Sequence, residues 1–217
     1  MKITNYFNTS EQEIKDKKFN ILIGISLGNK YFTESVIKES IVWALENTKG
    51  KVVVLIPDKL HAINYEIRNG YSKERAEKIS FRKGEQVKKI IENILEQISP
   101  NKRDLIDILK WQSIETTKYK SMTTAIWEEF EKNQEFKSII IEIMKENIKF
   151  DRLKDNDYVR LSAYVLNELP LLISGIEYNG LSYNIHPYPR LGKIEDLVVD
   201  LQDGRNFPEL TKKLSED

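Results

Sequence analysis

The chain has 217 residues, of which 40% are hydrophobic and 31% are charged, as in ordinary soluble globular proteins. Basic and acidic residues number 34 each, so the net charge is zero and a polyanionic partner would need a local basic surface. The lack of cysteine excludes disulfides, thiolate metal sites and cysteine nucleophiles. The sequence shows no signal peptide and no apolar run near the roughly 20 residues of a membrane span, so we expect a cytoplasmic protein without membrane association.

The first half of the chain predicts a strand–helix–strand unit and then a long helix. Residues 1–18 are polar and form an expected loose lead-in. Residues 20–26 and 51–56 are short apolar runs that end at turn residues, which is typical of buried strands. Residues 33–47 between them have apolar positions at helical spacing, as do residues 73–98. This order favours a parallel sheet.

The second half predicts a third strand at residues 105–111 and then mainly helices. The predicted helices are residues 123–133, 134–149 and 156–172. Residues 183–188 are expected to be extended, 197–201 to be a last strand and 208–214 a last helical turn. We therefore expect one α/β domain over residues 1–217.

Ser26 follows the first predicted strand and lies between Gly24 and Gly28. The carboxyl end of a strand is where α/β folds place ligands, and glycines allow other backbone to approach closely. The helix that starts soon afterwards could supply N–H groups to an oxyanion. Ser26 is thus a candidate nucleophile, and the alternative is a serine in a tight turn or a helix cap.

Residues 24–28 also match the G-x-S-x-G turn of serine hydrolases, so a serine esterase or lipase is an alternative function. In those enzymes the turn normally follows several strands, whereas here it ends the first. Only His61 and His186 could be the base, and both are expected to be ordinary polar residues. Asp203 and Gly204 could form a patatin-like Asp-Gly dyad, but the glycine-rich oxyanion loop that should precede the serine is missing.

A basic stripe is predicted on the long helix. At 100° per residue, four cations fall within about 60° of each other, and the apolar face is centred far from them. These are Arg75, Lys78, Arg82 and Lys89, with Lys83 and Lys88 nearby. Residues 68–89 contain eight basic and three acidic residues, a local net charge of +5. The stripe is a candidate contact for phosphates, and a non-catalytic RNA-binding module or a merely solvated face are the alternatives.

Tyr164 and Glu168 are four residues apart and share a helix face within an apolar segment. A carboxylate beside a phenol can hold an ammonium group or transfer a proton. We find no pattern of metal ligands and no nucleotide-binding loop, so no metal and no cofactor are expected.

Taken in order, these features resemble the cyclodipeptide synthases over about residues 18–190. The residues that carry the resemblance are Gly24-Ile25-Ser26 with Asn29, Leu55-Ile56-Pro57-Asp58, the basic helix Arg75 to Lys89, Trp111 followed by Tyr119, Tyr164-x-x-x-Glu168-Leu169-Pro170 and a tyrosine about twenty residues later. The resemblance implies a Rossmann-like parallel sheet flanked by helices, similar to the catalytic domain of class I aminoacyl-tRNA synthetases.

The resemblance also implies an activity: two aminoacyl-tRNAs are converted into a cyclic dipeptide without ATP. Ser26 would hold the first aminoacyl group, Tyr164 and Glu168 would hold its ammonium, and Tyr119 would line the site. Tyr188 is the expected late catalytic tyrosine, with Tyr183 as its rival. The basic helix would bind tRNA phosphates, and we expect a monomer.

The first amino-acid pocket is expected beside Ser26. The matching positions are Leu22, Gly24, Val54 and Leu171, with Asn29 as a further substrate contact. All four pocket positions are apolar or small, which favours a hydrophobic amino acid such as Leu, Phe or Met. Asn29 suits one branch of the family, whereas Tyr188-Pro189 suits the other, so the branch stays open.

Overall fold

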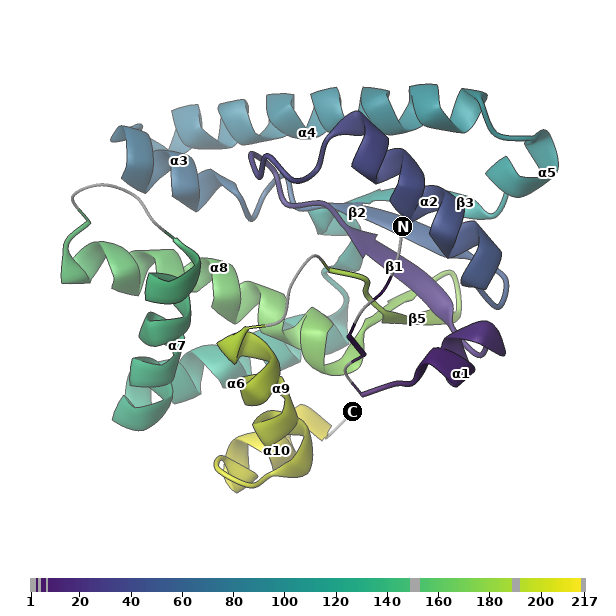
Figure 1. Ribbon diagram of the computed structural model, residues 1–217. Coiled ribbons are helices and arrows are strands. Elements are labelled where there is room, and N and C mark those ends of the chain that lie inside the picture. Colours follow the sequence, from purple (N-terminus) through teal and green to yellow (C-terminus); the bar gives the residue numbers. More distant parts are fainter. Residues whose placement is uncertain (1–2, 4, 7, 149–152, 189–191, 216–217) are drawn as a thin grey trace. The chain divides into compact units, whose positions relative to one another are not determined.

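The computed structural model describes residues 3, 5–6, 8–148, 153–188 and 192–215 (Figure 1). Its sheet has the spatial order β3-β2-β1-β5-β4. The strands are β1 (Asn20–Gly24), β2 (Val52–Ile56), β3 (Ile106–Lys110), β4 (Ile176–Tyr178) and β5 (Leu181–Ile185). β1 runs parallel to β2 and β5, β2 runs parallel to β3, and β4 is antiparallel to β5. The predicted α/β, Rossmann-like sheet flanked by helices is confirmed, with one antiparallel strand at its edge.

The chain divides into two compact units. Unit 1 comprises Met1–Lys59, Glu77–Ile114 and Gly175–Pro189, and unit 2 comprises Leu60–Ala76, Glu115–Ser174 and Arg190–Asp217. Unit 1 holds the sheet with α1 (Glu11–Lys15), α2 (Glu34–Asn47), α5 (Pro100–Arg103) and the 3-10 helix η1 (Trp111–Ile114). Unit 2 holds α3 (Ala62–Asn69), α6 (Thr117–Lys132), α7 (Gln134–Asn147), α8 (Asp155–Ser174), α9 (Lys193–Asp203) and α10 (Pro208–Ser215). The long helix α4 (Lys73–Glu96) begins in unit 2 and lies mostly in unit 1, and the single-domain organisation stays a prediction.

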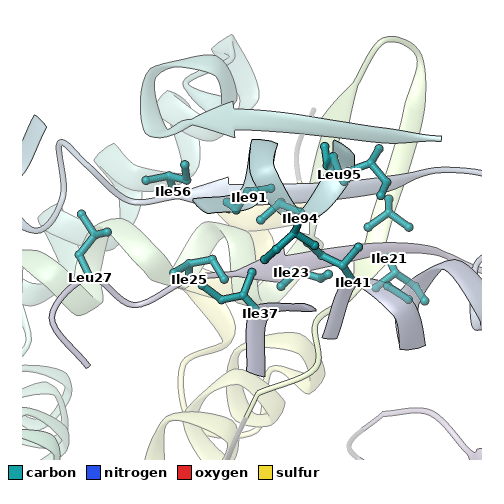
Figure 2. Close-up of a cluster of buried hydrophobic side chains, with 14 residues drawn as sticks. Ile21, Ile23, Ile25, Leu27, Ile37, Ile41, Ile56, Ile91, Ile94 and Leu95 are labelled. Carbon is teal, nitrogen blue, oxygen red and sulfur yellow. The ribbon is translucent and has the colours of Figure 1, made fainter. Parts of the chain in front are cut away.

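One face of the sheet in unit 1 packs against α2 and α4 (Figure 2). The cluster joins strand residues to helix residues that recur every three or four positions. Its members include Ile21 and Ile23 of β1, Val52, Val54 and Ile56 of β2, Ile37 and Ile41 of α2, and Ile91 and Ile94 of α4. Burying each such side chain contributes about 1.5–3 kcal/mol, so this cluster fixes both helices on the parallel strands.

Unit 2 is built around α8, which packs against α3, α6, α7 and α9. The rings of Phe136 and Phe207 meet edge to face at 5.2 Å and link α7 to the segment before α10. Among the described residues, no helix combines the length and the apolar composition needed to cross a membrane.

The prediction of a strand at residues 197–201 is wrong, because these residues belong to α9. The buried side chains recur at helical spacing: Leu197, Val198 and Leu201. The N–H of Gly192 donates to Glu195 Oε2 (2.5 Å) at the start of the helix. Gly204, in the left-handed conformation, ends it. Two strong end signals therefore outweigh the β propensity of the valines.

The lead-in of residues 1–18, expected to be loose, contains the short helix α1. Ser10 Oγ accepts a hydrogen bond from the N–H of Glu13 (3.2 Å), and Glu13 Oε2 accepts one from the N–H of Ser10 (3.1 Å). This capping box starts the helix, and Ile14 is buried. The segment is therefore partly anchored.

Strands β4 and β5 form a hairpin that the sequence analysis did not predict. Asn179 and Gly180 join them with φ values of 51° and 73°. A two-residue Asn-Gly loop with positive φ at both positions is typical of a type I′ turn. Gly175, just before β4, also has a positive φ of 71°, and a Cβ there would lie 2.4 Å from the carbonyl oxygen of Tyr183. Only glycine lets the two strands approach so closely.

We expect Gly175→Ala to destabilise the protein more than Gly180→Ala. Both glycines have positive φ, so alanine is strained by about 1 kcal/mol at either position. At Gly175 the new Cβ would also meet the Tyr183 carbonyl, whereas at Gly180 no atom lies within 4 Å. Urea unfolding should show an additional loss of about 1–3 kcal/mol for Gly175→Ala. Equal losses for the two variants would contradict the close approach of β5 to Gly175.

Candidate functional site

Ser26 lies in a tight turn directly after β1. The N–H of Asn29 donates to the carbonyl oxygen of Ser26 (3.2 Å), and Gly28 has a φ of 78°. Glycine at the third position with this φ is typical of a type II turn. Ser26 is partly exposed, and within the described part of the chain its hydroxyl has no hydrogen-bond partner. The hydroxyl is thus available to a substrate at the carboxyl end of β1.

Asn29 shapes the segment between this turn and α2. Its Oδ1 accepts the N–H of Tyr31 (3.0 Å), and its carbonyl oxygen accepts the N–H of Phe32 (3.2 Å). Thr33 then caps α2, because its Oγ1 accepts the N–H of Val36 (3.3 Å). The N–H of Val36, in the first turn of α2, is therefore used by this cap and does not stabilise an oxyanion. In the described part of the chain, the side-chain N–H groups of Asn29 donate to no other residue and are available to a ligand.

His186 lies beside the strand that carries Ser26. Its Nε2 accepts a hydrogen bond from the N–H of Gly24 (3.2 Å). Burial lowers the pKa of His186 to about 4. The basic nitrogen is therefore occupied and weakly basic, which argues against His186 as the general base of a Ser–His pair. Sequence reasoning treated His186 as an ordinary polar residue and missed this contact.

The two candidates for the late tyrosine differ sharply in environment. Tyr183 lies inside β5 and is 1% exposed, whereas Tyr188 follows β5 and is 48% exposed. The Tyr188 ring lies 6.2 Å from that of Phe32, in the segment after the Ser26 turn, and 5.6 Å from that of His186. Tyr188 is therefore the tyrosine near the Ser26 segment. Pro189, which bears on the family branch, lies outside the described residues.

The structure corrects one member of the predicted amino-acid pocket. Side chains alternate between the faces of a strand, and Val54 pairs with Ile23 on the face that packs against α2 and α4. Leu22 and Gly24 point to the opposite face, so Val54 cannot line one pocket with them. The residues of β2 that share this opposite face are Val53, which pairs with Leu22, and Leu55, which pairs with Gly24. All are apolar or small.

In unit 2, Tyr119, Tyr164 and Glu168 are grouped around α8. Tyr119 lies in the first turn of α6, which begins at Thr117, six residues before the predicted start at residue 123. Its hydroxyl donates to the carbonyl oxygen of Asn167 (2.8 Å), the residue before Glu168. The Tyr164 ring meets the ring of His61 at 6.2 Å. Within this unit, Tyr119 is thus fixed beside the turn of α8 that carries Glu168, and the roles of Tyr119, Tyr164 and Glu168 stay predictions.

Burial raises the pKa of Glu168 to about 7, and the negative charge of Glu195 adds to the effect. Leu171, one turn further along α8, is buried. A carboxyl with a pKa near neutrality can be ionised when an ammonium group approaches and can also accept or return a proton. Near-neutral pKa values caused by desolvation are typical of functional carboxyls.

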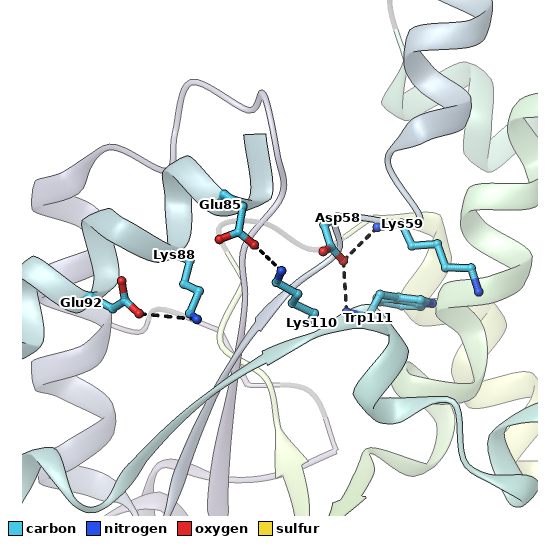
Figure 3. Close-up of polar contacts among 7 residues, drawn as sticks. All are labelled: Asp58, Lys59, Glu85, Lys88, Glu92, Lys110 and Trp111. Atoms are coloured by element: carbon cyan, nitrogen blue, oxygen red, sulfur yellow. Dashed lines mark hydrogen bonds and ion pairs between the residues drawn. The ribbon is translucent and has the colours of Figure 1, made fainter. Parts of the chain in front are cut away.

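The basic stripe on α4 is present, and most of its cations are exposed. The exposed ones are Arg75, Lys78, Arg82, Lys83 and Lys89. Lys88 is partly buried and forms an ion pair with Glu92 (3.5 Å; Figure 3). Glu85, an acidic residue of the same helix, pairs with Lys110 of β3, so its charge does not cancel the stripe. Arg75 stacks on the ring of Tyr71 at 4.0 Å.

Asp58, which follows β2, is bound to the residue after β3 through its carboxylate (Figure 3) and to α4 through its backbone carbonyl. Asp58 is 2% exposed, and its Oδ1 accepts the N–H groups of Lys59 (2.9 Å) and Trp111 (3.3 Å). The Ser80 hydroxyl of α4 donates to the carbonyl oxygen of Asp58. Asp58, found by resemblance as part of a motif, therefore has a structural role in this unit.

Apart from the basic stripe and Val54, the predicted site residues fall into two groups, one in each unit. In unit 1, Leu22 and Gly24 lie in β1, Ser26 and Asn29 follow β1, and Tyr188 follows β5. In unit 2, Tyr119 lies on α6, and Tyr164, Glu168 and Leu171 lie on α8. Among the described residues, no group of three or more acidic or histidine side chains could hold a metal ion.

Glu168 should make stability depend on pH. Its folded-state pKa of about 7 exceeds the unfolded value near 4.5, so between these pH values only the folded state keeps the proton. The contribution of Glu168 to the free energy of unfolding should therefore fall by up to about 3 kcal/mol as pH rises from 4.5 to 7, and the effect should level off above pH 7. Burial lowers the pKa of His61 and of His186 to about 4, which raises stability over part of this range in the wild-type protein and in the variant alike. In urea unfolding, the slope should therefore appear as the difference between the wild-type protein and Glu168→Gln. The exposed Glu209 of α10 provides the control, and a slope lost equally in Glu209→Gln would contradict the assignment.

A family model described as cyclodipeptide synthase matches residues 3–204 of the chain. Among similar solved structures, a cyclodipeptide synthase from Bacillus thermoamylovorans is 23% identical with a TM-score of 0.73, covering 91% of this chain and 86% of that one. A CDPS from Fluoribacter dumoffii is 15% identical with a TM-score of 0.72, covering 94% and 92%.

A Mycobacterium tuberculosis protein, whose structure is described as demonstrating that cyclodipeptide synthetases are related to type I tRNA synthetases, is 18% identical with a TM-score of 0.60, covering 75% of this chain and 69% of that one. A comparison with curated protein sequences finds no match. The structural likenesses show the fold, and the family match spans most of the chain. The chain therefore belongs to the cyclodipeptide synthase family, whose members are enzymes that make cyclodipeptides.

Proposed function

We propose that the protein condenses two aminoacyl groups, each delivered as an ester of tRNA, into a cyclic dipeptide, with Ser26 carrying the first group. Membership of the family supports the overall reaction. The observation that carries the role of Ser26 is its position: a partly exposed serine in the turn at the carboxyl end of β1, with a hydroxyl that no described residue engages. Ligands of parallel α/β folds bind at this edge.

The first step is an ester exchange. Ser26 Oγ attacks the carbonyl carbon of the first aminoacyl-tRNA, the ester bond to the terminal ribose breaks, and the serine proton goes to the departing ribose oxygen. An aminoacyl ester is already activated, so the step needs no nucleotide. His186 Nε2 accepts the Gly24 N–H and is therefore not a base for Ser26. The proton of Ser26 instead passes to the substrate itself.

The next two steps form the two amide bonds. The amine of the aminoacyl-Ser26 attacks the second aminoacyl-tRNA, which releases the second tRNA and leaves a dipeptidyl ester on Ser26. The free amine of this dipeptide then attacks the Ser26 ester, which closes the ring and returns a proton to Ser26 Oγ. Each attack requires an uncharged amine, so a proton must leave the ammonium group first.

Glu168 and Tyr164 are proposed to handle this ammonium group. The ionised Glu168 would hold the ammonium, and its pKa of about 7 suits a carboxylate that takes a proton and gives it back. Tyr164 is one helical turn before Glu168, and the Tyr119 hydroxyl is fixed on the carbonyl of Asn167. Tyr188, in the same unit as Ser26, is proposed to act on the aminoacyl group that Ser26 carries.

The first amino acid is proposed to be hydrophobic. Leu22 and Gly24 share their sheet face with Val53 and Leu55, and each of these positions is apolar or small. Positions of this kind favour an aliphatic or aromatic side chain over a polar one. Asn29 is proposed to contact the aminoacyl group through its amide N–H groups. Leu171, in unit 2, is also apolar and stays a predicted substrate contact.

Ser26→Ala should abolish cyclodipeptide formation, because no other group would carry the aminoacyl ester. The wild-type protein and the variant are expressed in bacteria, and diketopiperazines in the medium are identified by mass spectrometry. Purified wild-type protein incubated with charged tRNAs should also gain the mass of one aminoacyl group, and Ser26→Ala should not. Ser35→Ala, at an exposed position of α2, is the control and should behave as wild type.

The same assays distinguish the alternatives. Ester hydrolysis without diketopiperazines would support a serine esterase or lipase, and RNA binding without either activity would support a binding module. Cyclodipeptides that persist in Ser26→Ala would overturn the serine intermediate. Products that contain only polar amino acids would overturn the hydrophobic pocket.

The basic stripe of α4 is proposed to bind tRNA phosphates. Arg82→Glu with Lys89→Glu should lower kcat/KM at low aminoacyl-tRNA concentration by at least about tenfold, because each reversal removes one phosphate interaction and adds repulsion. The dependence of log binding constant on log salt concentration should also become less steep, by about one for each phosphate that the variant no longer binds. Arg75, Lys78 and Lys83 are proposed to bind phosphates in the same way, and Lys88 more weakly because Glu92 already pairs with it.

A matched control is Lys102→Glu on α5, an exposed lysine that is not part of the basic stripe. One such substitution changes the net charge as much as either reversal on the stripe. It should leave the kinetics and the salt dependence near wild type. Equal effects of Lys102→Glu and Lys89→Glu would mean that net charge matters and the stripe does not.

A further inference from the structure

The N–H of Gly24 points away from β2. Successive backbone N–H groups of a strand point to opposite neighbours. The N–H of Ile21 donates to the carbonyl oxygen of Lys51 (3.2 Å), and that of Ile25 donates to Leu55 (3.0 Å), both in or next to β2. The N–H of Gly24 therefore points to the side on which β5 lies.

β5 does not reach Gly24 with its backbone. The pairing of β1 with β5 is irregular and ends with Ile21 opposite Ile185, the last residue of β5. The next residue, His186, turns its side chain to the neighbouring strand, and Nε2 accepts the Gly24 N–H (3.2 Å). The imidazole thus takes the place of a strand carbonyl at the end of β1.

The imidazole also occupies the space where a side chain of residue 24 would lie. A Cβ on Gly24 would be 2.5 Å from His186 Nε2 and 2.9 Å from Cε1. The ring of Tyr188 lies on another side of the imidazole, 5.6 Å away. Because Nε2 accepts a hydrogen bond, the proton of the neutral ring is on Nδ1. Burial lowers the pKa of His186 to about 4, so the ring is neutral near pH 7.

We propose that His186 is a positioning residue for Ser26, because its Nε2 fixes the backbone of Gly24 and thereby the direction in which the nucleophile turn leaves β1. The inference rests on the proposed function of Ser26. Ile25 is held from the β2 side and Gly24 from the His186 side, so the strand is fixed on both sides just before Ser26. A freed Gly24 would let the turn shift, and a displacement of about 1 Å can lower a rate about 100-fold.

Two substitutions separate the hydrogen bond from the bulk of the ring. His186→Leu removes the acceptor and keeps an apolar side chain, whereas His186→Gln offers an amide oxygen to the same N–H. In single-turnover formation of the aminoacyl-enzyme, His186→Leu should be slower by about 10-fold to 100-fold, with KM for aminoacyl-tRNA within about twofold of wild type. His186→Gln should recover most of the rate.

Thermal unfolding of both variants sets a temperature at which each is folded, and the rates are measured there. Wild-type rates in His186→Leu would overturn the inference. Equal losses of rate in His186→Leu and His186→Gln would also overturn it. If His186 acted only through its bulk, both substitutions would slow the reaction to the same extent.

An independent measurement tests the geometry without any reaction. The chain has two histidines, so the ¹⁵N resonances of the imidazoles can be assigned by comparison with His186→Leu. We expect the His186 proton on Nδ1, and a proton on Nε2 at neutral pH would overturn this inference alone. Failure of the wild-type protein to form a cyclodipeptide would instead overturn the proposed function.

Discussion

Asp58 is the buried group on which the arrangement of unit 1 depends. Its carboxylate accepts the N–H groups of Lys59 and Trp111, and the Ser80 hydroxyl binds its carbonyl oxygen. These contacts join the carboxyl ends of β2 and β3 to α4, and an unpaired carboxylate at this depth would be strongly destabilising. Gly84 of α4 lies so close that a Cβ there would be 2.7 Å from the Asp58 Cβ. The apolar cluster holds the second half of α4 on the sheet, and the Ser80–Asp58 hydrogen bond together with the close approach of Gly84 adds a polar contact in its first half.

The carboxyl end of β1 is held by a hydrogen bond from its backbone to a histidine side chain. There the strand has β2 on one side and the side chain of His186 on the other. Because a side chain and not a further stretch of β5 accepts the Gly24 N–H, no strand of the sheet lies beside the Ser26 turn on this side. Both devices fix backbone with single polar groups at the edge of the sheet where ligands of this fold class bind.

Much of the fold could be predicted from local patterns. β1, β2 and β3 are short apolar runs bounded by turn residues, and α2 and α4 show clear helical periodicity. The hairpin of β4 and β5 is not predicted although Asn179-Gly180 is a strong turn signal, because both strands are short, with three and five residues. Residues 197–201 form a helix although their branched side chains favour a strand, because Glu195 and Gly204 provide helix start and end signals on either side.

The site was only partly predictable, for a physical reason. The place of Ser26 follows from its own strand and turn, so sequence alone was sufficient to propose it. The face of Val54 depends on the register between β1 and β2, and the role of His186 depends on where β5 stops. Pairing between distant segments sets both, and no local pattern contains that information.

The edge strand β4 has a consequence for how this sheet meets other molecules. It has three residues, and Glu177 at its centre is exposed. A short edge that carries a charge offers few free backbone groups and a desolvation penalty to any incoming strand. The sheet is thereby protected on this side against strand addition and amyloid-like stacking of one copy on another.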